Sequence, residues 1–335
     1  MMFNKTGICN GSTSAAGGGW GWYLVEDMAR PYVAWVDTHW LTFTEMITWS
    51  DATIFAVGTY AIHQIIAATF SLFYCLLHSH GLLLRYRIQT AEPFDKALFQ
   101  LATRHLIWRA LVKEFPVMLI MYSGFHYSGT KVRAPLPSIT RILGDWMLCW
   151  LWTETTFYWT HRLFHHRWFY KRFHKQHHTF KTSVALNTEY AHPLEHLISN
   201  VLTTFGGPLL LGSHVLVFWS YFAFRLWETF DGHSGYTIPI LSPFSVMPWW
   251  TGPQMHDFHH SHNIGAFGTM TCFWDWVCGT DKAYRMFAAK EKERQGRKEK
   301  EGRAKKEVKE EEESKMKKKM CEESVWKKTT KMYTQ

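Results

Sequence analysis

Cysteine is scarce in this chain, and no two cysteines lie at metal-binding spacing. The six cysteines among 335 residues include no C-x-x-C pair, which argues against a disulfide framework and against a thiolate metal site. The first 20 residues are rich in glycine and serine and lack the apolar core of a cleaved signal peptide. Metal chemistry would therefore need other side chains, and entry into a membrane would need a later segment.

Charge is also scarce, except at the C-terminal end. Residues 290–335 contain 17 Lys and Arg and 11 Asp and Glu, so this tail holds +6 of the net charge of +9. Its mixture of short charged blocks predicts a low-complexity tail that cannot bury a core of its own. The remainder is apolar and rich in aromatic residues, as is typical of proteins at a membrane interface. Because the basicity belongs to the tail, we expect no nucleic-acid partner.

The hydropathy pattern divides the chain into three parts. Residues 1–50 are predicted to be a disordered or interfacial N-terminus, 51–289 a membrane-embedded domain, and 290–335 the charged tail. Residues 52–78 are almost uncharged and long enough to cross a hydrocarbon core of about 30 Å. Arg85 and Arg87 follow this segment, so the positive-inside rule places its C-terminal end in the cytosol.

Two later segments are predicted to complete the membrane domain. Residues 139–160 form a second span that leads directly into a histidine-rich stretch. Residues 197–224 are apolar around Gly206, Gly207 and Pro208, which predict a turn between helices 192–206 and 209–230. We therefore expect an all-α integral membrane protein, with two helical hairpins capped by a cytosolic, helical, histidine-rich di-metal domain.

The histidines are concentrated in one part of the chain. Fourteen of the 20 lie between residues 161 and 262. His161 and His165 are an i, i+4 pair, and H-x-x-H-H occurs at 174–178 and again at 256–260. Residues three and four apart share a helix face, so each group can direct its imidazoles at one point. Neutral imidazole binds zinc, copper, iron and nickel, and this number of rings exceeds the four ligands of one tetrahedral ion.

Two metal ions are therefore predicted. The predicted ligands are His161, His165, His174, His177, His178, His192, His233, His256, His259 and His260. Beyond these ligands the sequence assigns no catalytic residue. His166, His196, His214 and His262 are predicted to be ordinary polar residues. Glu154, Glu189, Glu195, Asp231 and Asp257 are predicted to accept the second ring N–H of the ligands.

Several ordered motifs resemble the fatty acid hydroxylase/sterol desaturase superfamily of membrane di-iron enzymes, and in particular its C4-methylsterol monooxygenases. They are H-R-L-F-H-H at 161–166, E-Y-A-H-P-L-E at 189–195, E-T-F-D-G-H-S-G-Y at 228–236 and W-D-W-V-C-G-T-D at 274–281. The resemblance covers residues 145–284. Position 157 is phenylalanine, where some methylsterol monooxygenases carry a further histidine.

The resemblance implies a multi-pass enzyme of the endoplasmic reticulum membrane with its active site on the cytosolic face. It implies two iron ions, O2-dependent oxidation of the C4 methyl group of a sterol precursor, and electrons from NAD(P)H through cytochrome b5 and its reductase or a similar carrier. A sterol C5-desaturase and a sterol side-chain (25-) hydroxylase of the same superfamily remain alternatives. A histidine-rich metal transporter is a more distant one, because transporters place ionisable ligands inside their spans.

Overall fold

The structure is a computed structural model of the chain, and it describes residues 20–90, 95–242, 247 and 249–333. Residues 1–19, most of the segment predicted to be disordered, lie outside the described residues. The rest of the predicted N-terminal part is a helix, α1 (Trp20–Met46). The chain divides into two units after Cys278, and each unit is described by itself.

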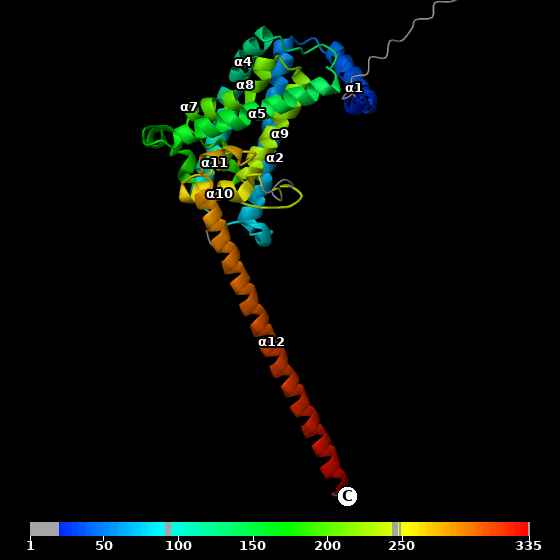
Figure 1. Ribbon diagram of the computed structural model, residues 1–335, viewed down its shortest axis with the longest axis vertical. Coiled ribbons are helices and arrows are strands. Elements are labelled where there is room, and N and C mark those ends of the chain that lie inside the picture. Colours follow the sequence, from blue (N-terminus) through cyan, green and yellow to red (C-terminus); the bar gives the residue numbers. More distant parts are fainter. Residues whose placement is uncertain (1–19, 91–94, 243–246, 248, 334–335) are drawn as a thin grey trace, which may run out of the picture. The chain divides into compact units, whose positions relative to one another are not determined.

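The regular elements of the described residues are helical, as predicted for the all-α class (Figure 1). After α1 they are α2 (Asp51–His80), η1 (Leu84–Tyr86), α3 (Lys96–Arg109), η2 (Ala110–Glu114), α4 (Phe115–Tyr127), α5 (Ile139–Phe164), α6 (Arg167–Phe169), η3 (Tyr170–His174), η4 (His177–Thr179), η5 (Ala185–Glu189), α7 (Pro193–Glu195), η6 (His196–Val201), α8 (Leu202–Leu211), α9 (Val215–Gly232), α10 (Gly252–His262), α11 (Phe273–Cys278) and α12 (Lys282–Tyr333).

Helix α2 matches the apolar segment predicted at 52–78. Ser50 caps its N-terminus by accepting a hydrogen bond from the Thr53 N–H at 3.2 Å, and Gly81 ends it in the left-handed conformation at φ 61°. Of the helices that the structure describes, α2 alone is long and apolar enough to cross a membrane by length and composition. Helix α5 forms where a second span was predicted, but it carries Arg141, Asp145 and Glu154.

The turn predicted at 206–208 is wrong. These residues lie inside α8, and the chain turns instead after Gly212, which ends α8 at φ 58°. The glycines serve close packing: a Cβ at Gly206 would lie 2.6 Å from the Trp152 ring, and one at Gly207 would lie 3.0 Å from the Cys149 backbone. Gly206 and Gly207 therefore allow α8 to pack closely against α5, and they do not form a turn.

Aromatic rings fill the core between α2, α4 and α9. Phe55, Phe125 and Phe218 are fully buried, and their ring centroids are 4.9–5.5 Å apart. Such offset and tilted pairs add to the free energy of burial. Figure 1 shows α10 at one end of the bundle that contains α2, α5, α8 and α9, so this core sets where the ends of α5 and α9 meet α10.

The tail is a single exposed helix, α12. Its charged side chains pair along the helix surface, for example Lys315 with Glu311 at 2.7 Å and Lys306 with Glu310 at 3.6 Å. Exposed i, i+4 pairs contribute only about 0.3–0.5 kcal/mol each. The helix has no apolar stripe that would pack it against a partner helix, as expected from its composition.

Candidate metal centre

Four parts of the chain supply the predicted ligands. His161 lies in the last turn of α5 and His165 caps the C-terminus of this helix, and the short elements η3 and η4 carry the first H-x-x-H-H group. His233 follows α9 directly, and α10 carries the second H-x-x-H-H group. Helix α10 begins with Pro253 in its first turn and ends at Asn263 in the left-handed conformation.

Nine of the ten predicted ligands gather into two clusters. The five-histidine cluster contains His161, His165, His174, His178 and His259, and the four-histidine cluster contains His177, His233, His256 and His260. Within each cluster one nitrogen of every ring lies within 4.8 Å of the corresponding atoms of the others. The H-x-x-H-H groups are thus split between the clusters, because adjacent histidines direct their rings to different points.

The Nε2 atoms of neighbouring rings face one another at short distances. In the five-histidine cluster the Nε2 atom of His174 lies 2.9 Å from that of His165 and 3.0 Å from that of His178. In the four-histidine cluster the Nε2 atom of His256 lies 2.8 Å from that of His233 and 3.2 Å from that of His260. These contacts link rings from elements that are far apart in the sequence.

The opposite ring nitrogens fix the tautomers. Four Nδ1 atoms lie 2.6–3.2 Å from backbone carbonyl oxygens, which can only accept: His161 at Phe267 O, His259 at Gly265 O, His233 at Thr229 O and His260 at Phe180 O. Each of these four rings must therefore donate from Nδ1 and present a bare lone pair at Nε2. The Nδ1 atom of His174 lies 2.7 Å from Glu195 Oε1, which accepts its proton when the carboxyl group is ionised.

This arrangement fits a bound cation. Lone pairs that face one another at about 3 Å repel, whereas two imidazole nitrogens bound to one ion at about 2.1 Å lie roughly 3.0–3.4 Å apart. The observed Nε2 separations of 2.8–3.4 Å fall in or next to that range. An all-imidazole donor set suits zinc, copper, iron or nickel rather than magnesium or calcium.

Burial keeps these rings neutral. It lowers the pKa of His161 and of His233 to about 4 and the pKa of His165 to about 2. The pKa values of the other six rings fall well below the ordinary value, first because of burial and then because of the neighbouring rings. At neutral pH a metal ion would therefore displace no proton from these nitrogens.

Of the five carboxylates predicted to support the ligands, only Glu195 contacts a ring of either cluster within the described residues. Its Oε1 accepts the Nδ1 proton of His174 at 2.7 Å, and burial raises the pKa of this carboxyl group. Glu154 and Asp257 instead accept backbone N–H groups of Thr271 and Ser183. Asp231 accepts from Tyr74 and Ser242, and Glu189 pairs with Arg109.

Backbone carbonyl groups, rather than the predicted carboxylates, accept the Nδ1 protons of four clustered rings. The loop after α10 supplies two of these carbonyl groups, since Gly265 O holds His259 and Phe267 O holds His161. Asp275 fixes this loop by accepting the N–H groups of Phe267 at 2.9 Å and Gly268 at 2.7 Å. Asp275 of the W-D-W motif therefore orients His161 and His259 indirectly, by fixing the loop whose carbonyl groups accept their Nδ1 protons.

The structure brings His192 to neither cluster. Its side chain caps α7, where Nδ1 accepts the Leu194 N–H at 3.2 Å, and its ring packs 5.0 Å from that of Phe173. The predicted tenth ligand is thus an N-cap, and the residue next to it, Pro193, starts the helix. His166, His196, His214 and His262 also lie outside both clusters.

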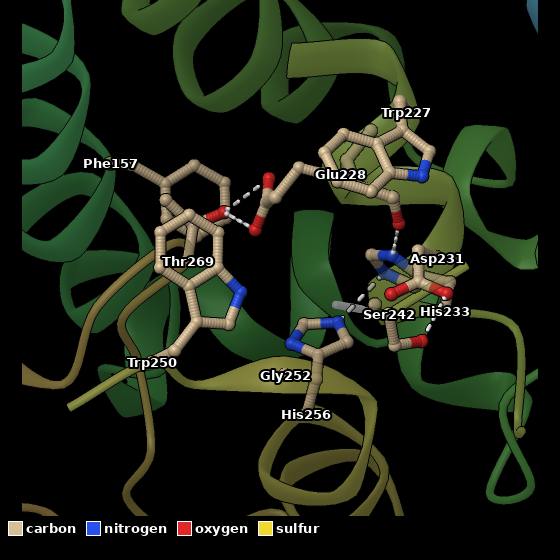
Figure 2. Close-up of a pocket in the computed structure, with 12 residues that line it drawn as sticks. Phe157, Trp227, Glu228, Asp231, His233, Ser242, Trp250, Gly252, His256 and Thr269 are labelled. Carbon is tan, nitrogen blue, oxygen red and sulfur yellow. Dashed lines mark hydrogen bonds between the residues drawn. The ribbon is translucent and has the colours of Figure 1, made fainter. Parts of the chain in front are cut away.

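A small cavity of about 30 Å³ adjoins the four-histidine cluster. His233 and His256 form part of its wall, and Glu228, Trp227 and Phe157 face it from the other sides (Figure 2). This volume suffices for a molecule the size of water or O2. It is too small for a lipid, so a lipid would have to approach from elsewhere.

A third polar group was missed by the reading of the sequence. His63 of α2 lies with Glu114 and Glu189 in a buried group that Arg109 joins. The available signal was that an ionisable residue inside an apolar segment, here His63, usually marks a functional site.

Comparisons with known proteins place the chain in a family. The family model for fatty acid hydroxylases matches residues 146–280. Methylsterol monooxygenase 2-2 of Arabidopsis thaliana is 33% identical to this chain over 70% of it and 89% of the relative. Methylsterol monooxygenase 1 of Rattus norvegicus is 32% identical over 80% and 88%, and a very-long-chain aldehyde decarbonylase of Oryza sativa is 32% identical over 75% and 93%. No solved structure matches.

The family match spans α5 to α11, and so it contains both histidine clusters and the W-D-W motif that orders them. The relatives extend the likeness over more than two thirds of the chain and most of their own length. The chain therefore belongs to the fatty acid hydroxylase family.

Proposed function

We propose that the protein is a membrane di-iron monooxygenase that oxidises the C4 methyl group of a sterol precursor with O2. The observation that carries this proposal is the convergence of nine imidazole rings into two clusters, of five and four rings, among the described residues. The methylsterol monooxygenases among the relatives supply the substrate class. In the net reaction one oxygen atom enters a methyl C–H bond and the other leaves as water, with two electrons and two protons consumed.

The five-histidine and four-histidine clusters would each hold one iron ion. When bound, reduced iron supplies the oxidising chemistry that an unactivated C–H bond requires. The chain contributes orientation: Glu195 and four backbone carbonyls hold the rings with Nε2 directed inward. It also contributes a dry surrounding, since seven of the nine rings are at most 7% exposed.

The electrons would come from NAD(P)H through cytochrome b5 and its reductase, or a similar carrier. We place α2 across the membrane of the endoplasmic reticulum, with Arg85 and Arg87 and the two clusters on the cytosolic side. The supporting observations are the length and apolar composition of α2 and the basic residues that follow it. A donor bound at the cytosolic face would pass electrons to the buried clusters without contacting the rings themselves.

The test is turnover by the purified full-length protein in lipid nanodiscs. We expect about two iron ions per chain by elemental analysis, and a C4-hydroxymethyl product from a 4,4-dimethylsterol with NADPH, cytochrome b5 and its reductase. The control is the His161→Ala variant, which should give no product from the same mixture because it removes a ligand. His192→Ala is the matched histidine variant that should remain active.

An aldehyde substrate is the informative competitor, because some relatives carry the name of very-long-chain aldehyde decarbonylases. A long-chain aldehyde should give no alkane under the same conditions. Alkane formation without sterol oxidation by an iron-loaded protein would replace the proposed reaction. A folded protein that holds no transition metal would reject the metal centre itself.

A further inference from the structure

The buried group around His63 is assembled from four separate elements. Arg109 at the end of α3 pairs with Glu114 of η2 at 2.7 Å and also with Glu189 of η5. His63 of α2 lies between the two carboxylates, with Nδ1 3.3 Å from Glu114 and Nε2 3.4 Å from Glu189. All four side chains are at most 8% exposed. Burying so many ionisable groups is costly, and such groups are kept where they have a task.

These groups form the deep end of a cavity of about 290 Å³. The outer part of its wall is apolar and open, since Trp108 and Leu197 are each 52% exposed. Phe222 and Leu226 continue the apolar wall inward. The volume lies near the lower end of the range of about 300–1,000 Å³ for small-molecule sites. An apolar mouth with a polar inner end suits a lipid that enters polar group first.

The charges decide which polar group fits. The guanidinium of Arg109 already faces both carboxylates, and its other contacts go to His196 and to the Glu189 carbonyl. It would repel a metal cation, and it has no obvious capacity left for an anionic head group. The carboxylate oxygens are acceptors with remaining capacity. The site therefore favours a neutral donor, such as a hydroxyl group, over a carboxylate or a sulfate.

The wall of this cavity also reaches the four-histidine cluster. Thr229 lines it, and the carbonyl oxygen of the same residue accepts the Nδ1 proton of His233 at 2.7 Å. Thr229 lines the small cavity beside His233 and His256 as well. A ligand held by the buried carboxylates would therefore occupy a cavity that shares the wall residue Thr229 with the metal centre, and its apolar part would extend toward Trp108 and Leu197.

We propose that this cavity binds the sterol substrate with its 3-hydroxyl group at Glu114 and Glu189, so that oxidation occurs next to the hydroxyl-bearing carbon. This proposal rests on the proposed function and deepens it, because C4 is the neighbour of the carbon that bears the hydroxyl group. The same orientation disfavours oxidation of the sterol side chain, whose carbons would lie at the cavity mouth.

The test is equilibrium binding of a radiolabelled 4,4-dimethylsterol to the full-length protein in nanodiscs, with unlabelled competitors. The free 3-alcohol should compete at least about 10-fold better than its 3-O-methyl ether, which cannot donate a hydrogen bond, or its 3-sulfate, which is anionic. This comparison needs no mutation. Equal competition by the ether or the sulfate would overturn the proposal, as would equal competition by hexadecan-1-ol.

Two pairs of variants locate the binding site. Val117→Trp narrows the cavity and should weaken sterol binding at least about 10-fold, whereas Leu210→Trp, on an exposed face of α8 outside the cavity, should not. Glu114→Gln should reduce the preference for the alcohol over the ether, whereas Asp145→Asn, which alters a buried carboxylate elsewhere, should preserve it. Unchanged binding in Val117→Trp would overturn the assignment of the cavity.

The binding and turnover experiments test the cavity assignment and the proposed function separately. If the chain binds the 3-alcohol as described but oxidises no sterol when iron-loaded, the proposed function fails while the cavity assignment stands. If it oxidises the 4,4-dimethylsterol and its 3-O-methyl ether equally well, the proposed function stands and the placement of the hydroxyl group is rejected.

Discussion

The two histidine clusters differ in what surrounds them. The five-histidine cluster has one more ring, and Glu195 gives it the only carboxylate that touches a cluster ring among the described residues. The four-histidine cluster has fewer rings, and within the described residues no carboxylate contacts one of them. A cavity of about 30 Å³ lies against His233 and His256 of this cluster. Metal sites that react keep a coordination position open, whereas structural sites are closed.

The difference therefore assigns separate tasks. The five-histidine cluster would hold an ion firmly, because its rings, from α5, η3, η4 and α10, are fixed by a carboxylate and by the loop after α10. The four-histidine cluster would leave room beside an ion, because the small cavity lies against it, and Thr229 lines both this cavity and the larger one. The following experiments test this division.

The largest effect is expected from loss of a ligand. His256→Ala leaves three rings in its cluster and His165→Ala leaves four, which is a full set for a four-coordinate ion. Both variants should lose turnover by more than the roughly 10–100-fold typical of an outer-shell partner. After identical dialysis against a weak chelator, elemental analysis should find about one ion per chain in His256→Ala and about two in His165→Ala. Equal metal loss would remove the distinction between the clusters.

A smaller effect is expected from Glu195→Gln. An amide oxygen can still accept the Nδ1 proton of His174, but it no longer carries a charge to balance a bound cation. The metal affinity of the five-histidine cluster, or the rate of sterol turnover, should fall roughly 10–100-fold. The measurement is a chelator titration with sterol turnover in parallel, and Asp145→Asn is the matched control. An equal loss of both ions would contradict the placement of Glu195 at the five-histidine cluster alone.

The metal-free protein should lose stability in acid. Imidazoles of the unfolded chain take up protons near pH 6.5, whereas burial holds the pKa of His233 at about 4 and that of His165 at about 2 in the folded chain. The unfolded chain then binds more protons, so the free energy of unfolding is fully present above about pH 6.5 and falls as the pH drops. Thermal unfolding of chelated protein between pH 8 and pH 5 checks the direction.

The same measurement compares the clusters. Both folded-state pKa values lie below pH 5, so His165 and His233 stay neutral in the folded chain over this range, and His165→Ala and His233→Ala should flatten the pH profile by similar amounts. An unfolding temperature that does not change over this range would show that the rings are accessible to protons in the folded state.

The smallest effect is expected from removal of the tail. Residues 290–335 contain no histidine, and α12 belongs to the second unit of the chain. A stop after Ala289 should leave iron content and sterol oxidation unchanged in detergent, measured against the full-length protein. A well-folded truncated protein that has lost its iron would place the boundary of the metal-binding unit beyond residue 289.

The sequence predicted the rings of the centre better than their supports. The i, i+4 pair at 161 and 165 and the two H-x-x-H-H groups pointed to eight of the nine clustered histidines, because i, i+3 and i+4 neighbours share a helix face. His233 has no such neighbour, and only the motif at 228–236 pointed to it. The sequence failed for His192, since H-P-L-E at a helix start has the same letters whether the ring binds metal or caps the helix. It failed for Gly206 and Pro208 because a glycine that allows close packing looks like one that allows a turn.

The groups that orient the ligand rings could not be predicted from the sequence, for a physical reason. A carboxylate is visible in a sequence, but the carbonyl groups of Thr229, Gly265 and Phe267 belong to the backbone, which every residue carries. Likewise the group around His63 depends on contacts such as that between Gln64 and Glu114, 50 residues apart. Only the packing of α2 against its neighbours brings them together.

The loop after α10 also sets when the centre can be completed during synthesis. His161 is held by the carbonyl of Phe267, 106 residues later, and that loop is fixed by Asp275. At about 5–20 residues per second, the ribosome needs roughly 5–20 s to make the intervening chain. The first ligands therefore leave the ribosome well before their anchor exists. A metal ion could find the complete, anchored set of rings only after translation of α11, and a chain that stalls before Asp275 would expose unanchored histidines to any available metal.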